Sequence, residues 1–542
     1  MNTLYYGDNL DILQRYIKDE SVDLVYLDPP FNSNANYNVL FAQKDGKQSS
    51  AQIQAFEDTW QWDEIAIHTY TNEVEKGGAI ADALRAFYLI LGDSNMMAYL
   101  TMMAPRLKEL HRVLKSTGSL YLHCDPTASH YLKVLLDMVF GAENYINEII
   151  WERSQTRSSI SKALTRAHDT IYFYAKSKDY KYNLQFRDLS EASLALYNNE
   201  DEKGKYQAVP LLVSGTRNGT TGEVWRGIDP NSRGRAGMHW VTTPSNLDEY
   251  EKQGLIIWPE KDGGTPRLKY YLEQSPGVPM NDIWDDIPLI SSSSKESWGY
   301  PTQKPRALLD RIIKASSDAG DIVLDPFCGC GTAISSAEYL NRGWIGIDIT
   351  HLAIGLIKRR IEGDFGPDLI YEVIGEPTTV DGARTLAEQD KYQFQWWALG
   401  LVGARPADQK KGADRGIDGR LFFHDGKATE TKQVILSVKG GQHMNVSHIR
   451  DLIGVLDREK ADIGVYICLE EPTKPMRQEA AGAGFYHSEV WNRDYPRVQI
   501  LTIPELLNGK QIDMPPIQQV NQTFKRARRL KKHEGDQMGL DL

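Results

Sequence analysis

Residues 28–31 form the first of two short motifs whose residue types could do chemistry. Asp28-Pro29-Pro30-Phe31 follows directly after the apolar run VDLVYL. Two prolines stiffen the backbone and remove two amide donors, so backbone carbonyls and the Asp28 carboxylate are left as hydrogen-bond acceptors at one spot. With the adjacent aromatic face, the set suits a heteroaromatic amine whose N–H groups donate while its ring is clamped. The alternative is a proline-rich turn with a structural role.

The second motif, DPFCGCGT at 325–332, follows another apolar run and precedes a helical pattern. Gly329 and Gly331 allow a tight turn and the close approach of a ligand to the helix N-terminus. A dinucleotide fingerprint would need a third glycine where Ile334 stands, so dinucleotide binding is disfavoured. Asp348 ends the next predicted strand, at the spacing where a carboxylate can bind ribose hydroxyls. The pattern favours an adenosyl cofactor without a pyrophosphate.

The cysteines do not indicate a metal site or a disulfide framework. Cys328 and Cys330 form one C-x-C without a second pair, which favours small residues lining a turn over zinc ligands. Four cysteines in so long a chain indicate a reduced, cytoplasmic compartment. The longest nearly apolar stretch, 396–404, is far shorter than the ~20 residues that span a bilayer, so no membrane partner is expected.

Both motifs lie in segments where short strands alternate with helices. Such alternation predicts an α/β fold with a parallel sheet, and it places both motifs at strand ends. In the first segment we expect a strand ending at Asp28, helices at 95–114 and 128–139, and a strand at 119–123. In the second segment we expect strands at 322–327 and 343–349 and helices at 305–317, 332–341 and 351–361.

The chain of 542 residues is longer than one compact core normally allows, which predicts several domains. Residues 1–150 and 301–375 carry the α/β alternation, and an irregular insert separates them at 151–300. That insert is rich in Gly, Ser and Asn and has only weak strands, such as the one at 169–175. A linker at 376–384, a small α/β unit at 385–510 and a basic tail at 511–542 complete the prediction. In the small unit we expect helices at 385–403 and 446–458 and strands at 417–423, 432–439 and 462–468.

The net charge of −11 argues against a protein that coats nucleic acid by bulk charge. Two local basic clusters nevertheless stand out within this total. One comprises Arg153, Arg157, Lys162 and Arg166, and the other spans 525–532. The first cluster could contact phosphates or bases, and the alternative is a solvated basic face.

Together these motifs resemble the permuted (β-class) DNA amino-methyltransferases, especially the Mod-type adenine methylases. DPPF precedes DPFCGCGT as in that family, and further blocks match at 7–13, 119–141, 148–154 and 301–313. The resemblance covers about residues 1–375. It implies a class I methyltransferase fold, a Rossmann-like sheet with a circularly permuted motif order, with S-adenosylmethionine as methyl donor and double-stranded DNA as substrate. It also implies a target-recognition region within the insert.

The same resemblance assigns roles to individual residues. Asp28 to Phe31 would hold a flipped-out base, and the DPPF form favours adenine over cytosine as the target. Asp28 and the Pro29 carbonyl would accept both amino N–H bonds and aim the nitrogen lone pair at the methyl group. The expected cofactor ligands are Asp8 at the adenine, Asp348 at the ribose, and Asp325, Phe327, Gly329 and Gly331 at the methionine side, with Thr302 and Lys304 nearby.

The C-terminal unit resembles the restriction-endonuclease-like fold, in particular its Mrr-like branch. By that resemblance Asp418 would coordinate Mg²⁺ and Lys439 would orient or activate the attacking water. The family usually has Glu or Gln where this chain has Ser437, and Ser is a poor ligand for a hard cation. Glu388 on the preceding helix is a candidate substitute. His443 and His448 are either ligands or ordinary residues of a helix entry.

Three functions follow from these observations. The first is a DNA adenine methyltransferase, or a cytosine amino-group methyltransferase, whose nuclease-like unit assists DNA binding. The second is a bifunctional enzyme that also cleaves unmethylated DNA with Mg²⁺. The third is a non-catalytic DNA-binding module, which the intact DPPF and glycine motifs disfavour. The expected partners are DNA and either a second copy of the chain or a restriction-modification partner.

Overall fold

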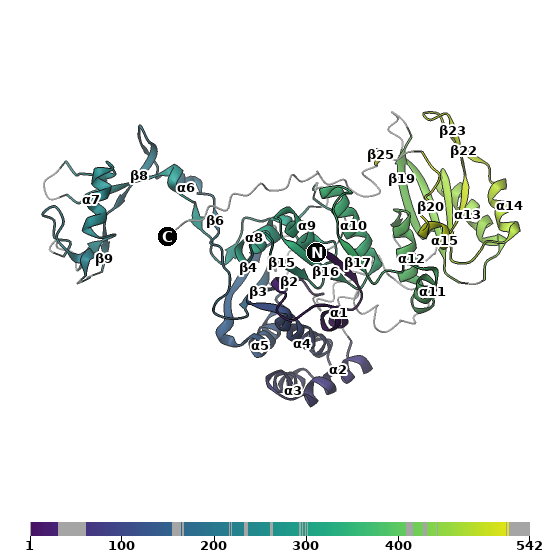
Figure 1. The fold of residues 1–542 in the computed structure, drawn as a ribbon, viewed down its shortest axis with the longest axis horizontal. Coiled ribbons are helices and arrows are strands. Elements are labelled where there is room, and N and C mark those ends of the chain that lie inside the picture. Colours follow the sequence, from purple (N-terminus) through teal and green to yellow (C-terminus); the bar gives the residue numbers. More distant parts are fainter. Residues whose placement is uncertain are drawn as a thin grey trace. The chain divides into compact units, whose positions relative to one another are not determined.

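A computed structural model shows the fold of the chain (Figure 1). It describes residues 2–30, 61–153, 164, 167–215, 217, 219–231, 237–260, 264–291, 294, 296–298, 300, 302–407, 416–425, 431–441, 443–515 and 518–519. The chain divides into two compact units. The first comprises Met1–Asn183 with Asp282–Leu542, and the second is Leu184–Asn281.

A nine-stranded sheet organises the first unit, in the order β14-β4-β5-β3-β2-β15-β16-β1-β17. Strand β5 runs antiparallel to both of its neighbours, and the other pairings are parallel. The predicted α/β fold is therefore confirmed. The strands are β1 (Thr3–Tyr6), β2 (Val22–Leu27), β3 (Leu114–Cys124), β4 (Tyr145–Glu152), β5 (His168–Ala175), β14 (Ile283–Trp284), β15 (Ile322–Asp325), β16 (Gly343–Asp348) and β17 (Glu372–Ile374).

Helices cover both faces of this sheet (Figure 1). On one face, α1, α3, α4 and α5 bury a leucine- and methionine-rich core, and α2 packs beside them. On the other face, α8, α9 and α10 pack around buried residues that include Trp151 and Trp344. The helices are α1 (Asn9–Tyr16), α2 (Glu64–Glu75), α3 (Ala79–Leu91), α4 (Asn95–Val113), α5 (Ser129–Phe140), α8 (Arg306–Ser316), α9 (Thr332–Tyr339) and α10 (His351–Phe365).

The compact second unit is shorter than the region expected to be irregular. Strand β5, expected as a weak strand of the insert, lies inside the main sheet and is buried along nearly its whole length. Its continuous apolar sequence is typical of a strand covered on both faces. After the second unit the chain returns to the sheet at once, because β14 pairs with β4.

The second unit has a small core of its own, formed by Leu211, Leu212, Trp225, Trp240 and Leu247. A four-stranded sheet has the order β11-β12-β8-β7, and two further strand pairs are β9 with β10 and β6 with β13. Its elements are β6 (Phe186–Arg187), α6 (Glu191–Leu194), β7 (Asn199–Asp201), β8 (Gly204–Pro210), β9 (Leu212–Ser214), β10 (Met238–Trp240), α7 (Pro244–Lys252), β11 (Ile256–Ile257), β12 (Arg267–Tyr271) and β13 (Val278–Pro279).

The C-terminal part of the first unit contains a separate sheet with the order β18-β19-β20-β21-β24, and β25 pairs with β19. The single helix expected at 385–403 is two helices, because the extended backbone of Asp390 interrupts it and its side chain caps the second. The elements are α11 (Val380–Gln389), α12 (Lys391–Leu401), β18 (Arg405–Pro406), β19 (Gly419–His424), β20 (Thr431–Lys439), α13 (Val446–Glu459), β21 (Ile463–Cys468), α14 (Lys474–Gly482), β22 (Phe485–Ser488), β23 (Arg493–Pro496), β24 (Val498–Thr502), α15 (Ile503–Leu507) and β25 (Gln518–Gln519).

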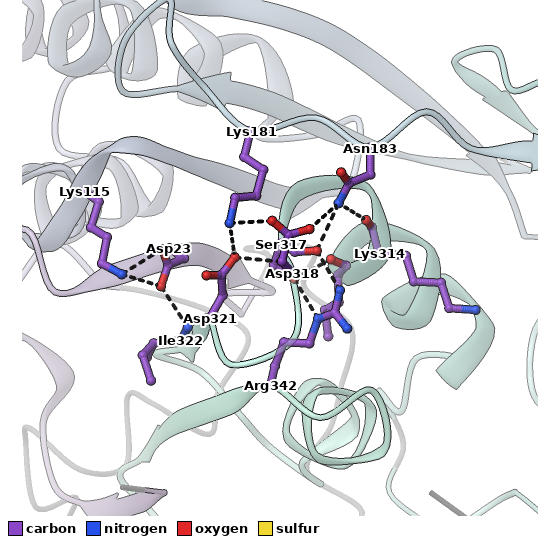
Figure 2. Close-up of polar contacts among 11 residues, drawn as sticks. Asp23, Lys115, Lys181, Asn183, Lys314, Ser317, Asp318, Asp321, Ile322 and Arg342 are labelled. Atoms are coloured by element: carbon purple, nitrogen blue, oxygen red, sulfur yellow. Dashed lines mark hydrogen bonds and ion pairs between the residues drawn. The ribbon is translucent and has the colours of Figure 1, made fainter. Parts of the chain in front are cut away.

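A polar cluster ties the strands of the main sheet together at the starts of β2 and β15 (Figure 2). The buried Asp23 carboxylate accepts hydrogen bonds from Lys115 Nζ at 2.8 Å and from the Ile322 amide at 2.9 Å. Nearby, the Asn183 side chain donates to the Lys314 carbonyl at 3.0 Å and to the Ser317 carbonyl at 3.1 Å. Because these residues are far apart in sequence, the cluster fastens the two halves of the sheet to each other.

All four cysteines are buried free thiols. Among the described residues, no helix is long and apolar enough to cross a membrane.

Replacement of Asp23 tests the contribution of this cluster to stability. Asp23→Ala leaves the Ile322 amide without its acceptor, so we expect the free energy of unfolding to fall by about 2 kcal/mol. The matched control is Asp11→Ala, which breaks the surface pair with Arg15 and should cost less than about 0.5 kcal/mol. Thermal unfolding followed by calorimetry measures both variants. Equal midpoints for the two would contradict a structural role for Asp23.

Candidate active site

Four carboxylates lie at the carboxyl ends of four neighbouring parallel strands. Asp28 follows β2, Asp325 ends β15, Asp348 ends β16, and Asp8 lies just beyond β1. These strands are adjacent in the order β2-β15-β16-β1. In open α/β sheets, ligands bind in the crevice outside the carboxyl ends of the strands. The sheet thus brings together both motifs that the sequence singled out.

Asp28 is paired with a lysine from the other half of the chain. Lys304 Nζ donates to Asp28 Oδ2, and the two side chains are only 11% and 17% exposed. The family resemblance predicted Lys304 near the methionine side of a cofactor, whereas in the structure Lys304 forms an ion pair with Asp28. Pro29 is buried beside it and Pro30 is half-buried. Phe31 lies outside the described residues.

The loop after β15 is a tight turn that leads into α9. Gly329 and Gly331 both have positive φ, +48° and +72°, and the Gly331 amide donates to the Cys328 carbonyl at 2.7 Å. Asp325 is buried, and its Oδ1 accepts from the Phe327 amide at 3.0 Å. Burial raises the pKa of Asp325 well above its usual range, and the nearby carboxylates of Asp28 and Asp348 raise it further.

Asp348 links the glycine turn to the next strand end. Its Oδ2 accepts from the Gly329 amide at 2.9 Å, and its Oδ1 accepts from both the amide and the hydroxyl of Thr350 at 3.0 Å. Burial raises its pKa to about 6, and these hydrogen bonds oppose the rise. A carboxylate fixed in this way can still accept hydroxyl hydrogens with its remaining lone pairs.

The glycine turn has no room for side chains. A Cβ on Gly329 would lie 3.2 Å from the Tyr300 ring, and one on Gly331 would lie 2.8 Å from Ile357 Cγ1. The turn therefore presents bare backbone at the N-terminus of α9, where a ligand can approach closely. The surrounding carboxylates suit ribose hydroxyls and a positively charged sulfonium. Thr302 is exposed two residues before Lys304.

Sequence reasoning missed two residues beside Asp8: Arg106, which bonds its carboxylate, and Asn9, which bonds Arg106. The Asp8 side chain caps α1, and its Oδ2 accepts from Arg106 Nη2 at 2.9 Å. Arg106 also donates to Asn9 Oδ1 at 2.7 Å, and Asn9 Nδ2 donates to the Pro326 carbonyl at 2.8 Å. Asn9 thus connects the end of β1 to the loop that follows β15. The position of Asn9 directly after Asp8 could have identified it from the sequence. Arg106 lies in the middle of α4, where no motif marks it.

In the C-terminal unit, the predicted Mg²⁺ ligand Asp418 accepts hydrogen bonds from the neighbouring strand. Asp418 Oδ2 accepts from the Val438 amide at 2.7 Å and from the Ser437 hydroxyl at 3.3 Å. Lys439 is exposed at the end of β20, and His448 Nδ1 lies 3.1 Å from the Tyr466 hydroxyl. Glu388 and His443 are exposed. Within the described part of the chain, no group of three or more His, Cys, Asp or Glu side chains could hold a metal ion.

Of the first predicted basic cluster, the described member Arg153 forms an ion pair. Its Nη1 lies 3.2 Å from Asp169 Oδ1 on β5. Arg157, Lys162 and Arg166 lie outside the described residues, as does the basic stretch at 525–532.

Comparison with known proteins finds similar sequences among DNA methyltransferases. The type II methyltransferase M.EcaI of Enterobacter cloacae is 35% identical over 48% of this chain and 57% of its own length. The StyLTI Mod subunit of Salmonella typhimurium, from a type III restriction-modification enzyme, is 26% identical over 63% of this chain and 50% of its own length. The chain thus spans about half the length of these curated relatives.

One solved structure with a bound ligand is also similar. It is a putative DNA modification methylase of Thermus thermophilus, TTHA0409, complexed with S-adenosyl-L-methionine. It is 15% identical, covers 69% of this chain and all of its own, and has a TM-score of 0.33.

Two families match separate parts of the chain. Residues 391–508 match the family described as NACHT-associated inactive restriction endonuclease 1, which agrees with the predicted endonuclease-like fold. Residues 22–359, well over half of the chain, match the N6/N4 DNA methylase family, and this range contains Asp28, the glycine turn and Asp348. The chain therefore belongs to the N6/N4 DNA methylase family.

Proposed function

We propose that this protein transfers a methyl group from S-adenosylmethionine to the exocyclic amino group of an adenine flipped out of double-stranded DNA. The observation that carries the proposal is the convergence of Asp28-Pro29, Asp325 and Asp348 at the carboxyl ends of three neighbouring strands. That arrangement offers acceptors for an amino group next to a turn suited to an adenosyl cofactor. The motif order along the chain supports the permuted class.

The chain's own residues act on the target base by positioning and electrostatics. Asp28 and the Pro29 carbonyl accept the two amino N–H bonds, which draws the nitrogen lone pair out of conjugation with the ring and aims it. Because an amino group inside a duplex is already paired, the base must leave the helix before Asp28 can reach it. Phe31, by the family resemblance, provides the stacking surface.

The cofactor supplies a methyl group already activated on a positively charged sulfur, so no covalent enzyme intermediate is required. Asp348 would accept the ribose hydroxyls and Asp8 would approach the adenine. Asp325, Phe327, Gly329 and Gly331 would line the methionine side, with Thr302 nearby. The fixed carboxylates at these strand ends also favour a cation electrostatically.

Adenine is favoured over cytosine as the target. The motif has Asp rather than Ser in its first position. The relatives include Mod subunits and a protein named as a DNA adenine methyltransferase, YhdJ of Escherichia coli, which is 25% identical over 66% of this chain.

We further propose that the C-terminal unit does not cleave DNA. Asp418 is committed to the Val438 amide and the Ser437 hydroxyl, and Ser437 stands where a second acidic or amide ligand would be needed. The family that matches this region is itself described as inactive. A retained DNA-binding role fits this arrangement better than Mg²⁺-dependent cleavage of unmethylated DNA.

Asp28→Ala tests the assignment of the base acceptor. We expect the rate of methyl transfer to fall at least about 100-fold, because one of two acceptors for the amino group is lost. The dissociation constant for S-adenosylmethionine should not increase, because Asp28 is assigned to the base and not to the cofactor. Transfer of labelled methyl groups to DNA from a methylation-free host measures the first, and calorimetry the second. Asp11→Ala is the control, and substantial transfer by Asp28→Ala would refute the assignment.

The pKa of Asp348 predicts a pH dependence of cofactor binding. Because this pKa is raised to about 6, the carboxyl takes up a proton as the pH falls through 6 and loses its strength as an acceptor for ribose hydroxyls. If only the ionised form binds, affinity at pH 5.5 should be about fourfold weaker than at pH 7.5. Asp348→Asn should bind weakly without this pH step. A wild-type affinity that is flat across this range would contradict the role given to Asp348.

A cleavage assay tests the C-terminal unit. Wild-type protein should leave unmodified DNA intact with Mg²⁺ present. Asp418→Ala should lower the free energy of unfolding by about 1–2 kcal/mol, because the Val438 amide loses its acceptor. Metal-dependent cutting by the wild type that disappears in Lys439→Ala would overturn this proposal and favour a bifunctional enzyme.

A further inference from the structure

The ion pair between Lys304 and Asp28 occupies one oxygen of the carboxylate that the proposed reaction uses. Asp28 Oδ2 is bonded to the Lys304 ammonium, and both side chains are largely buried. Burial weakens the screening of this pair by solvent and salt. A target amino group that donates to the same oxygen must therefore compete with a positive charge.

Each partner of this pair has an alternative ligand of suitable chemistry under the proposed function. Asp28 would accept hydrogen bonds from the base. Lys304 belongs to the 301–313 block that leads into the cofactor loop. Its positive charge also lowers the pKa of Asp325 in that loop, against the larger rise caused by burial. The cofactor's methionine part carries a carboxylate, which is the kind of group an ammonium binds.

We propose that Lys304 couples the two ligand sites: without cofactor it withholds Asp28 from the base, and the cofactor carboxylate draws it away and releases Asp28. Lys304 is thus a positioning residue that acts on the base through Asp28. The inference rests on the proposed function and deepens it. It predicts that cofactor binding strengthens capture of the target base, and by linkage that the captured base strengthens cofactor binding equally.

The energetic argument concerns what replaces the broken pair. Separating a largely buried pair is costly when one charge is left without a partner, but an exchange of one carboxylate for another limits that cost. The cofactor therefore lowers the cost of freeing Asp28. Coupling of this kind ordinarily changes affinity by about 5–150-fold.

The structure offers a matched control on the same strand. Lys115 pairs with Asp23 at the beginning of β2, as Lys304 pairs with Asp28 beyond its end. Lys115 Nζ lies 2.8 Å from both carboxylate oxygens of the buried Asp23. This pair belongs to the polar cluster of Figure 2, at the opposite end of β2 from Asp28. A substitution there removes a comparable charge without touching the candidate active site.

The test measures binding to a duplex that carries the chain's methylation site with 2-aminopurine at the target position. Two non-reactive ligands are compared. Sinefungin keeps the methionine carboxylate, and 5′-deoxy-5′-methylthioadenosine lacks it. In the wild type, sinefungin should strengthen duplex binding and the fluorescence of the flipped base by about tenfold, whereas methylthioadenosine should change them less than about twofold.

Lys304→Gln keeps a hydrogen-bond donor and removes the charge. Its cofactor-free affinity for the duplex should rise about threefold or more, and its coupling to sinefungin should fall below about twofold. Lys304→Arg should retain coupling, and Lys115→Gln should behave as the wild type.

Two outcomes would overturn the proposal. One is full coupling in Lys304→Gln. The other is a folded Lys304→Gln that loses sinefungin affinity while its cofactor-free duplex affinity stays at the wild-type level, because Lys304 would then be a cofactor ligand alone. Failure of the proposed function itself would look different, since the wild type would then methylate no DNA site.

Discussion

The candidate active site depends on one electrostatic constraint: several carboxylates must be held close together at the carboxyl ends of neighbouring strands in one sheet. Asp28, Asp325 and Asp348 lie at adjacent strand ends, and burial together with mutual repulsion raises the pKa of Asp325. Lys304 supplies a positive charge within this group. The backbone amides of Phe327 and Gly329 supply hydrogen bonds to the others. The same acceptors that are costly to assemble are those that an amino group and an adenosyl sulfonium require.

The sheet meets this constraint by joining segments that lie far apart in the sequence. Strand β2, from the N-terminal part, pairs with β15, which lies about 300 residues later, and β1 pairs with β16. At the opposite end of these strands, Asp23 and Lys115 fasten the same elements together. The two halves of the α/β pattern are therefore parts of one sheet rather than two docked domains, and the residues between them separate them in the sequence.

Sequence patterns predicted the parts of this site that are local. DPPF and DPFCGCGT mark themselves by composition, and strand–helix alternation places them at strand ends. The Lys304–Asp28 pair and the bonds of Arg106 to Asp8 and Asn9 could not be predicted in this way, because they depend on which strands become neighbours. Strand β5 was expected in the insert because the sequence on either side of it is irregular. Its own nearly continuous burial in the main sheet could not be seen from those neighbours. The break at Asp390 was missed because the polar residues at 388–391 also suit the exposed side of one continuous helix.

In the C-terminal unit, which matches an endonuclease-like family, Asp418 forms hydrogen bonds within the sheet. Asp418 joins β19 to β20 through the Val438 amide, which is a structural use of a carboxylate that metal chemistry would need open. Methyl transfer is the activity that the match to the N6/N4 DNA methylase family points to. The most direct measurement is modified-base sequencing of DNA from a methylation-free host that expresses the protein. The account predicts N6-methyladenine at one short recurring sequence. Unmodified DNA, or methylation on cytosine alone, would contradict it.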